Sequence, residues 1–240
     1  MLDRIKIEHT EVYGFRASMR GMRNPMDSWH LSDTIRFTGG ELVENNNIVY
    51  ENISIGDKDL DLAVRLTKAG TEHCKFLRQI RVWSDLTVPR YIWSELDTYH
   101  FNTKNSCSTM HKLFNAKKEI TEEQFMYNEV DKEKLDKDIE YLNKLREEYL
   151  KSKDTDILRR GKQVLPEGFL QKRTWDTNYQ ELLGIYFQRR HHRLDDWKPI
   201  CSWIESLPYM NRFIDAIEEA RKPKVIEKVI TTPVDYVAGA

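Results

Sequence analysis

The chain has 240 residues, enough for one large domain or two small ones with a substantial apolar core. Charged residues make up 32% of it, yet 38 basic and 39 acidic side chains leave a net charge of −1. A chain with so little net charge has no overall electrostatic attraction to nucleic acid or to an acidic membrane surface, so neither partner is expected.

The three cysteines, Cys74, Cys107 and Cys201, are far apart and odd in number, which fits neither a disulfide framework nor a zinc site. The first residues do not read as a signal peptide, and no apolar run approaches the length of a membrane span. We therefore expect a cytoplasmic protein without a metal site. Because glycine and proline are scarce and no linker interrupts the chain, we expect one domain over residues 1–221, followed by a C-terminal tail over 222–240.

The N-terminal part reads as strands and loops. Residues 4–19 alternate apolar and polar side chains around a break at Gly14, which predicts one or two strands. The following loop to Trp29 carries Arg16, Arg20 and Arg23 among methionines. Guanidinium groups suit phosphate or carboxylate, and methionine and tryptophan suit a flat ring, but an irregular surface loop has the same composition.

Short strands are expected over residues 31–56, and a helix capped by Asp57 or Asp59 is expected to run to about residue 71. Residues 75–86 read as a strand that leads into a helix beginning at Pro89. The apolar pattern then stops, and residues 97–111 predict a polar loop that faces water or a polar ligand.

The second half is more helical. Residues 119–128 and 131–152 are strongly charged, and the latter carry a narrow apolar stripe that predicts a helix packed on the body or on a neighbouring subunit. Residues 167–175 read as a strand, and Thr177 or Asn178 is expected to cap the helix after it. A last helix is expected over residues 195–220, with a kink at Pro208.

Two separated blocks carry a resemblance to the flavin-dependent thymidylate synthases. That family has the motif Arg-His-Arg-x-x-Ser-x-Asn-Glu-x-Ser-x-Arg-Tyr after a proline-led helix. The same spacing at residues 98–111 keeps Asn105 and Ser108 and places Thr103 at the first serine, but replaces the three arginines and the glutamate. Met110 stands at the last arginine.

The second block is more specific. The family has a cationic residue before a Leu-Pro pair, then an asparagine thirteen residues after that leucine, then a helix that ends in arginine. Here Lys162 precedes Leu165-Pro166, Asn178 has the required spacing, and Arg189 follows eleven residues later without a gap. The resemblance covers roughly residues 57–207.

The resemblance implies an α/β (α+β) fold, the thymidylate synthase-complementing protein fold, with a central, mainly antiparallel sheet flanked by long helices. It implies FAD-dependent methylation of dUMP to dTMP with methylenetetrahydrofolate as methylene donor and NADPH as reductant. It also implies a homotetramer whose active sites lie between subunits.

The resemblance assigns residue roles as well. Arg189 is implied as the catalytic cation that polarises the pyrimidine ring and contacts the substrate, because arginine stays charged and donates from a planar fork. The other implied substrate-binding residues are Glu95, Ser106, Ser108 and Lys162, the last from another subunit. The implied FAD-binding residues are Thr98, Tyr99, His100, Asn105, Asn178 and Gln180.

Alternatives remain open on the sequence. Arg189 could be a helix-end cation that interacts with the helix dipole. A metal site at His191 and His192 is disfavoured because adjacent helical residues point about 100° apart. Glu95, where the family has glutamine, and the replaced arginines favour two rivals. One is a relative that binds a pyrimidine nucleotide but catalyses another C5 modification such as hydroxymethylation, and the other is a catalytically silent homologue.

Overall fold

The computed structural model describes residues 2–37 and 42–222. Its centre is a six-stranded sheet in which only the β1–β4 pair is parallel, which confirms the expected mainly antiparallel sheet. In spatial order the strands are β3 (Leu42–Asn45), β4 (Ile48–Glu51), β1 (Lys6–Tyr13), β6 (Arg81–Pro89), β8 (Leu170–Asn178) and β7 (Thr103–Ser106). A second, two-stranded sheet pairs β2 (Ile35–Arg36) with β5 (Ile53–Ser54).

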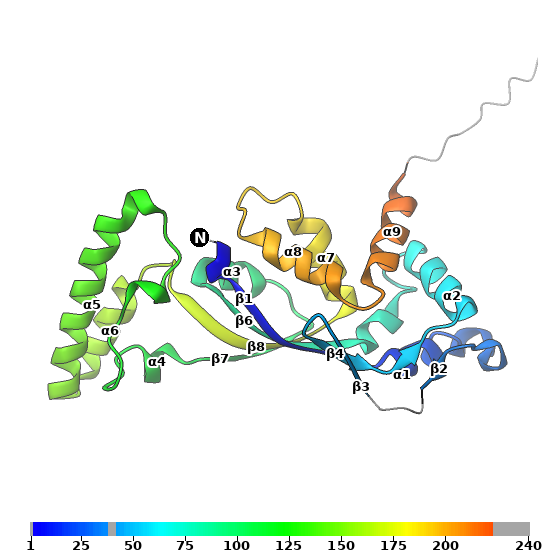
Figure 1. The fold of residues 1–240 in the computed structure, drawn as a ribbon, viewed down its shortest axis with the longest axis horizontal. Helices are drawn as coiled ribbons and strands as arrows, with labels where there is room; N and C mark the ends of the chain where they lie inside the picture. Colours follow the sequence, from blue (N-terminus) through cyan, green and yellow to red (C-terminus); the bar gives the residue numbers. More distant parts are fainter. Residues whose placement is uncertain (1, 38–41, 223–240) are drawn as a thin grey trace, which may run out of the picture.

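Helices cover one face of the large sheet (Figure 1). They are α7 (Tyr179–Arg189), α8 (Trp197–Ser206) and α9 (Met210–Arg221), with α2 (Asp57–Lys68) packed beside α9. The indole Trp203 Nε1 donates to Thr10 Oγ1 at 3.0 Å and so ties α8 to β1. Trp93 of α3 (Arg90–Leu96) donates to the carbonyl of Gln171 at 2.7 Å and ties α3 to β8. None of the described helices has both the length and the apolar composition needed to cross a membrane.

An arm of two helices, α5 (Lys132–Ser152) and α6 (Thr155–Val164), extends from one end of the molecule (Figure 1). It has its own apolar cluster: Leu113, Phe114, Ile120, Phe125, Leu135, Leu142, Leu145, Leu158 and Leu165. Gly161 allows α6 to approach closely, because a Cβ there would lie 2.3 Å from the Phe114 ring. At the base of the arm, Arg4 donates to the carbonyls of Glu122 and Phe125 at 2.9 and 2.6 Å.

A buried carboxylate organises the segment between β1 and α2. Asp59 is fully buried, pairs with Arg23, and accepts from Ser32 Oγ at 2.7 Å and Thr34 Oγ1 at 2.6 Å. Burial raises the pKa of Asp59, but these hydrogen bonds outweigh it and leave the pKa below its ordinary value. Arg23, one of the three arginines in the segment for which a ligand loop and a plain surface loop were both left open, is therefore an internal counter-ion.

Several expected N-terminal boundaries were wrong. Gly14 adopts a left-handed conformation (φ 101°), ends β1, and is followed by the helix α1 (Phe15–Gly21) where a strand was expected. The carboxylate of Asp33, rather than Asp57 or Asp59, caps α2 by accepting from the amides of Lys58 and Asp59 at 3.0 Å each. Residues Lys75–Gln79 form a 3-10 helix, so the predicted strand begins only at β6.

Later boundaries also shift. The predicted polar loop 97–111 contains the edge strand β7 and the short helix α4 (Thr109–Lys112). Of the expected helix 119–128, only Glu122–Gln124 is helical, and it is a 3-10 turn. The expected last helix is interrupted rather than kinked at Pro208, where Tyr209 takes a left-handed conformation (φ 61°) between α8 and α9. The predicted tail lies outside the described residues from 223 onwards.

Candidate active site

Arg189, the last residue of α7, is held from three sides. Its Nη1 forms an ion pair with Glu95 of α3, and its Nε donates to the Tyr99 hydroxyl at 3.1 Å. The guanidinium carbon lies 4.7 Å from the centre of the Trp197 ring. These contacts fix the position of Arg189, and 18% of its side chain is exposed.

The start of α7 fixes the loop that carries Tyr99. Asn178 is 1% exposed, and its Oδ1 caps α7 by accepting from the Glu181 amide at 3.1 Å. Glu181 in turn accepts from the Phe101 amide at 3.1 Å and from Asn102 Nδ2 at 2.8 Å. The Tyr99 hydroxyl, held next to this anchored turn, donates to Gln188 Oε1 at 2.8 Å.

The turn after α7 brings an imidazole to the same carboxylate. The Leu194 amide donates to His192 Nδ1 at 3.2 Å, so the neutral ring carries its proton on Nε2. That Nε2 lies 3.6 Å from Glu95 Oε2. Arg189 and His192 therefore face the same oxygen of Glu95.

A cavity of about 430 Å³ lies beside this cluster, between the end of α2, α7 and α9. Gln180 and Gln188 contribute amide groups to its lining, and Leu183, Phe187 and Ile217 contribute apolar surface. Gln180 Oε1 accepts from Arg78 Nε at 2.8 Å. Because Gln188 also contacts Tyr99, the cavity and the Arg189 cluster share a wall.

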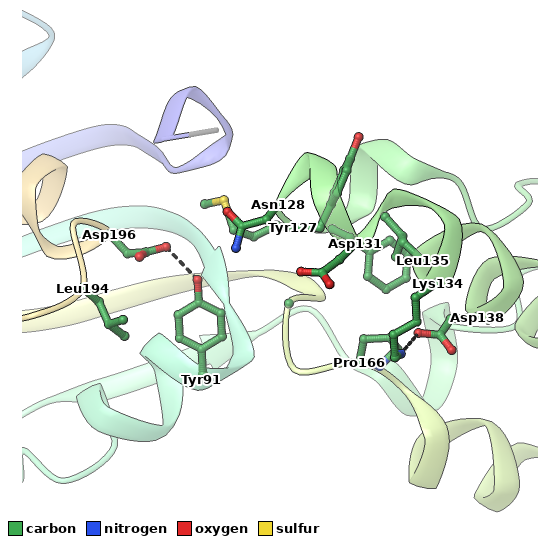
Figure 2. A pocket seen from close by; sticks show the side chains of 13 residues that line it. Tyr91, Tyr127, Asn128, Asp131, Lys134, Leu135, Asp138, Pro166, Leu194 and Asp196 are labelled. Carbon is green, nitrogen blue, oxygen red and sulfur yellow. Dashed lines mark hydrogen bonds and ion pairs between the residues drawn. The ribbon is translucent and has the colours of Figure 1, made fainter.

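A larger cavity, about 620 Å³, opens between α5 and the body (Figure 2). The Tyr91 hydroxyl donates to Asp196 Oδ1 at 2.6 Å on one side of it, and Lys134 pairs with Asp138 at 2.5 Å on the other. Burial first, and then the hydrogen bond to Asp196, raise the pKa of Tyr91, so its hydroxyl stays protonated at neutral pH.

The structure brings some sequence-predicted residues together and separates others. Glu95, Tyr99 and Arg189 meet directly, and Asn178 and Gln180 lie at the opposite end of α7. The remaining predicted residues lie elsewhere: Thr98 and His100 are exposed, Asn105 and Ser106 lie exposed on β7, Ser108 precedes α4, and Lys162 is half-buried on α6. In Figure 1, α6 and α7 lie at different parts of the molecule, so Lys162 and Arg189 of one chain belong to separate places.

Sequence reasoning missed three residues of the cluster. Trp197 was given no role at the site, although its ring faces Arg189. His192 was considered as part of a disfavoured metal site and not as a neighbour of Glu95. Glu181 was not singled out. The available signal was its place three residues after the predicted cap Asn178, where an acid commonly serves a helix start.

The fold is similar to that of the flavin-dependent thymidylate synthases. Two solved structures with this fold are crystal structures of thymidylate synthase X (ThyX) from Helicobacter pylori, both with FAD and dUMP. Each has a TM-score of 0.64 and 15% sequence identity, and they cover 89% and 88% of this chain and 99% of their own. The sequence itself matches no protein-family model and no curated protein. At this identity the likeness establishes the fold.

Proposed function

We propose that this chain binds FAD and a pyrimidine nucleotide and methylates dUMP at C5 to give dTMP. Methylenetetrahydrofolate would supply the one-carbon unit, and NADPH would reduce the flavin. The observation that carries the proposal is the contact between Arg189 and Tyr99 at the wall of the cavity lined by Gln180 and Gln188. Arg189, which would polarise the pyrimidine ring, therefore lies next to a cavity that could hold a flat cofactor.

The lining of that cavity fits a flavin. Its apolar floor suits the tricyclic ring, and the amides of Gln180 and Gln188 suit the polar ring edge. Among the lining residues, Arg221 and Lys68 carry positive charge that would face a pyrophosphate, with Lys68 also paired to Glu219, and Arg78 lies nearby. These cations would replace the two family arginines that became Thr98 and His100. When bound, reduced flavin supplies a hydride.

The chain's own residues would orient and polarise the nucleotide. Arg189 would donate from Nη2 to a ring oxygen, because its Nε and Nη1 are already engaged. Tyr99 and Trp197 would shield the guanidinium from water and so strengthen its effect on the ring.

The phosphate of the nucleotide would use Ser106 and Ser108 of one subunit and Lys162 of another. The support is the position of Lys162 on the arm, away from the α7 end of its own chain (Figure 1). A site assembled in this way requires an oligomer, and we propose the homotetramer. Light scattering that shows a dilution-stable monomer would contradict this part.

Gly184 offers a test of the FAD site. It lines the cavity, and a Cβ there would meet no atom within 4 Å. Gly184→Trp should fill the cavity without unfolding α7 and should abolish co-elution of FAD on gel filtration. Gly184→Ala is the matched control. It should retain FAD and gain about 0.5–1 kcal/mol of stability, since alanine favours the helix interior.

The unmodified protein should elute with yellow, protein-bound FAD and form dTMP from dUMP, methylenetetrahydrofolate and NADPH. If no flavin co-elutes even with dUMP present, the flavoenzyme proposal fails and the silent homologue gains. If flavin and nucleotide bind without dTMP formation, another C5 modification such as hydroxymethylation becomes the function to assay. The pairing of Arg189 with Glu95 is the observation that favours this second candidate.

A further inference from the structure

The pairing of Arg189 with Glu95 leaves one free donor next to one free acceptor. Arg189 uses Nη1 for Glu95 and Nε for Tyr99, and its Nη2 has no hydrogen-bond partner among the described residues. Glu95 uses Oε2 for Arg189, and within the described part of the chain its Oε1 accepts no hydrogen bond. Neither side chain is fully buried: 18% of Arg189 and 29% of Glu95 is exposed.

An arginine without a carboxylate partner would offer a ligand two donors instead of one. Its planar fork places two donors side by side, which suits two adjacent acceptors such as a ring nitrogen that has lost its proton and the oxygen beside it. Here the carboxylate of Glu95 occupies half of that fork. A negative charge on the ring would now lie close to a second negative charge and be disfavoured.

We infer that Glu95 and Arg189 together recognise the neutral edge of a pyrimidine. A ring or exocyclic N–H would donate to Glu95, and the adjacent acceptor on the ring would accept a hydrogen bond from Arg189. This inference rests on the proposed nucleotide site. It makes Glu95 a specificity-determining residue that selects against the ring anion. His192 Nε2 lies 3.6 Å from the same Glu95 oxygen that pairs with Arg189, so Glu95 Oε2 faces both side chains.

Uracil and cytosine nucleotides both present such an edge. Uracil offers N3–H beside a carbonyl oxygen, and cytosine offers its amino group beside the unprotonated N3. Carboxylates accept from the cytosine amino group in nucleic-acid recognition, so dCMP belongs in the test beside dUMP. The nucleotide that binds more tightly, dUMP or dCMP, identifies which neutral edge the site prefers.

The test uses 5-fluoro-dUMP, whose ring N–H ionises at a much lower pH than that of dUMP. Binding of both nucleotides to the FAD-loaded protein is measured between about pH 6 and about pH 9, spanning the fluorinated ring's ionisation. The pH dependence that comes from the phosphate and from the protein is common to both nucleotides, so it cancels in the ratio of their affinities. The protein groups that face the site are Arg189, His192 and Tyr99, and the Tyr91–Asp196 pair lies one helical turn away.

For the unmodified protein, the relative affinity for 5-fluoro-dUMP should fall about tenfold as its ring ionises, which corresponds to a shift of one pKa unit in the bound ring. Glu95→Gln should remove that fall. Glu218→Gln is the matched control, because Glu218 pairs with the neighbouring Arg190 on the α9 side and should leave the fall unchanged.

A relative affinity that stays level or rises with pH in the unmodified protein would overturn the inference. So would a Glu95→Gln profile that matches the unmodified one. Either result, obtained while dUMP still binds, leaves the proposed function intact. If dUMP, dCMP and 5-fluoro-dUMP all fail to bind to the flavin-loaded protein, both the inference and the nucleotide site it rests on are wrong.

Discussion

Replacing Arg189 by alanine separates a catalytic role from a structural one, because the next residue provides a control. Arg189→Ala removes the donor aimed at the substrate together with the contacts to Glu95, Tyr99 and Trp197. Arg190→Ala removes a comparable set, since Arg190 pairs with Glu218 and lies 4.8 Å from the Phe187 ring.

The two changes should cost similar stability. A half-exposed ion pair contributes about 0.2–1 kcal/mol and a cation–π contact about 0.5–1 kcal/mol, so each variant should lose about 1–2 kcal/mol. Their effects on turnover should differ. A preorganised donor at the developing charge is worth about 3–4 kcal/mol, or a few hundredfold in rate, and only Arg189 is in place to supply it.

The assays are dTMP formation at saturating substrate and urea denaturation on the same preparations. Arg189→Lys should also turn over poorly, because one ammonium cannot hold Glu95 and Tyr99 and still donate to the ring. If Arg190→Ala were the more damaging to turnover, the assignment along the sequence would be off by one residue. If both variants retained activity and lost only stability, Arg189 would be a structural helix-end residue.

Asp59→Ala leaves the buried guanidinium of Arg23 without its counter-ion. It should lower the free energy of unfolding by about 3–5 kcal/mol in urea denaturation. The lowered pKa of Asp59 means that its contribution is complete above about pH 4 and is lost as pH falls through the folded-state pKa. Acid unfolding should therefore be shallower in the variant, and identical acid profiles would contradict this. Lys162→Ala and Arg189→Ala proteins, each inactive alone, should regain activity after co-refolding if one site uses both subunits. No recovery would argue against a shared site. Gly161→Val should destabilise the arm by about 1–3 kcal/mol through overpacking, and amide exchange in α5 would report it. Unchanged exchange would refute the close contact.

Much of the fold could be predicted from local signals. The cap at Asn178 and the long charged helix α5 were confirmed because each depends on residues near in sequence. The edge strand β7 was missed because it is polar on both faces, so no alternation marks it. Residues 119–128 have helical composition, but Phe125 bridges to Phe169 instead, a contact that the local sequence does not reveal.

The candidate site was only partly accessible for the same reason. Arg189 and Tyr99 could be named in advance from the two resemblance blocks, and Glu95 from the wider resemblance over residues 57–207. Their mutual engagement could not, because α3 and α7 are brought together by the sheet and not by any local pattern. The pairing changes the chemistry expected of Arg189, from a free two-donor fork to a single donor beside a carboxylate.

The separate apolar cluster of the arm has a consequence for how the molecule loses structure. Because the contacts that hold α5 and α6 together are mostly internal to the arm, its opening free energy is set independently of the large sheet. Amides of α5 and α6 should then exchange with solvent as one cooperative unit, before those of β6 and β8. In an assembly where the arm reaches a neighbouring site, warming would disconnect the sites from one another while each sheet remained folded.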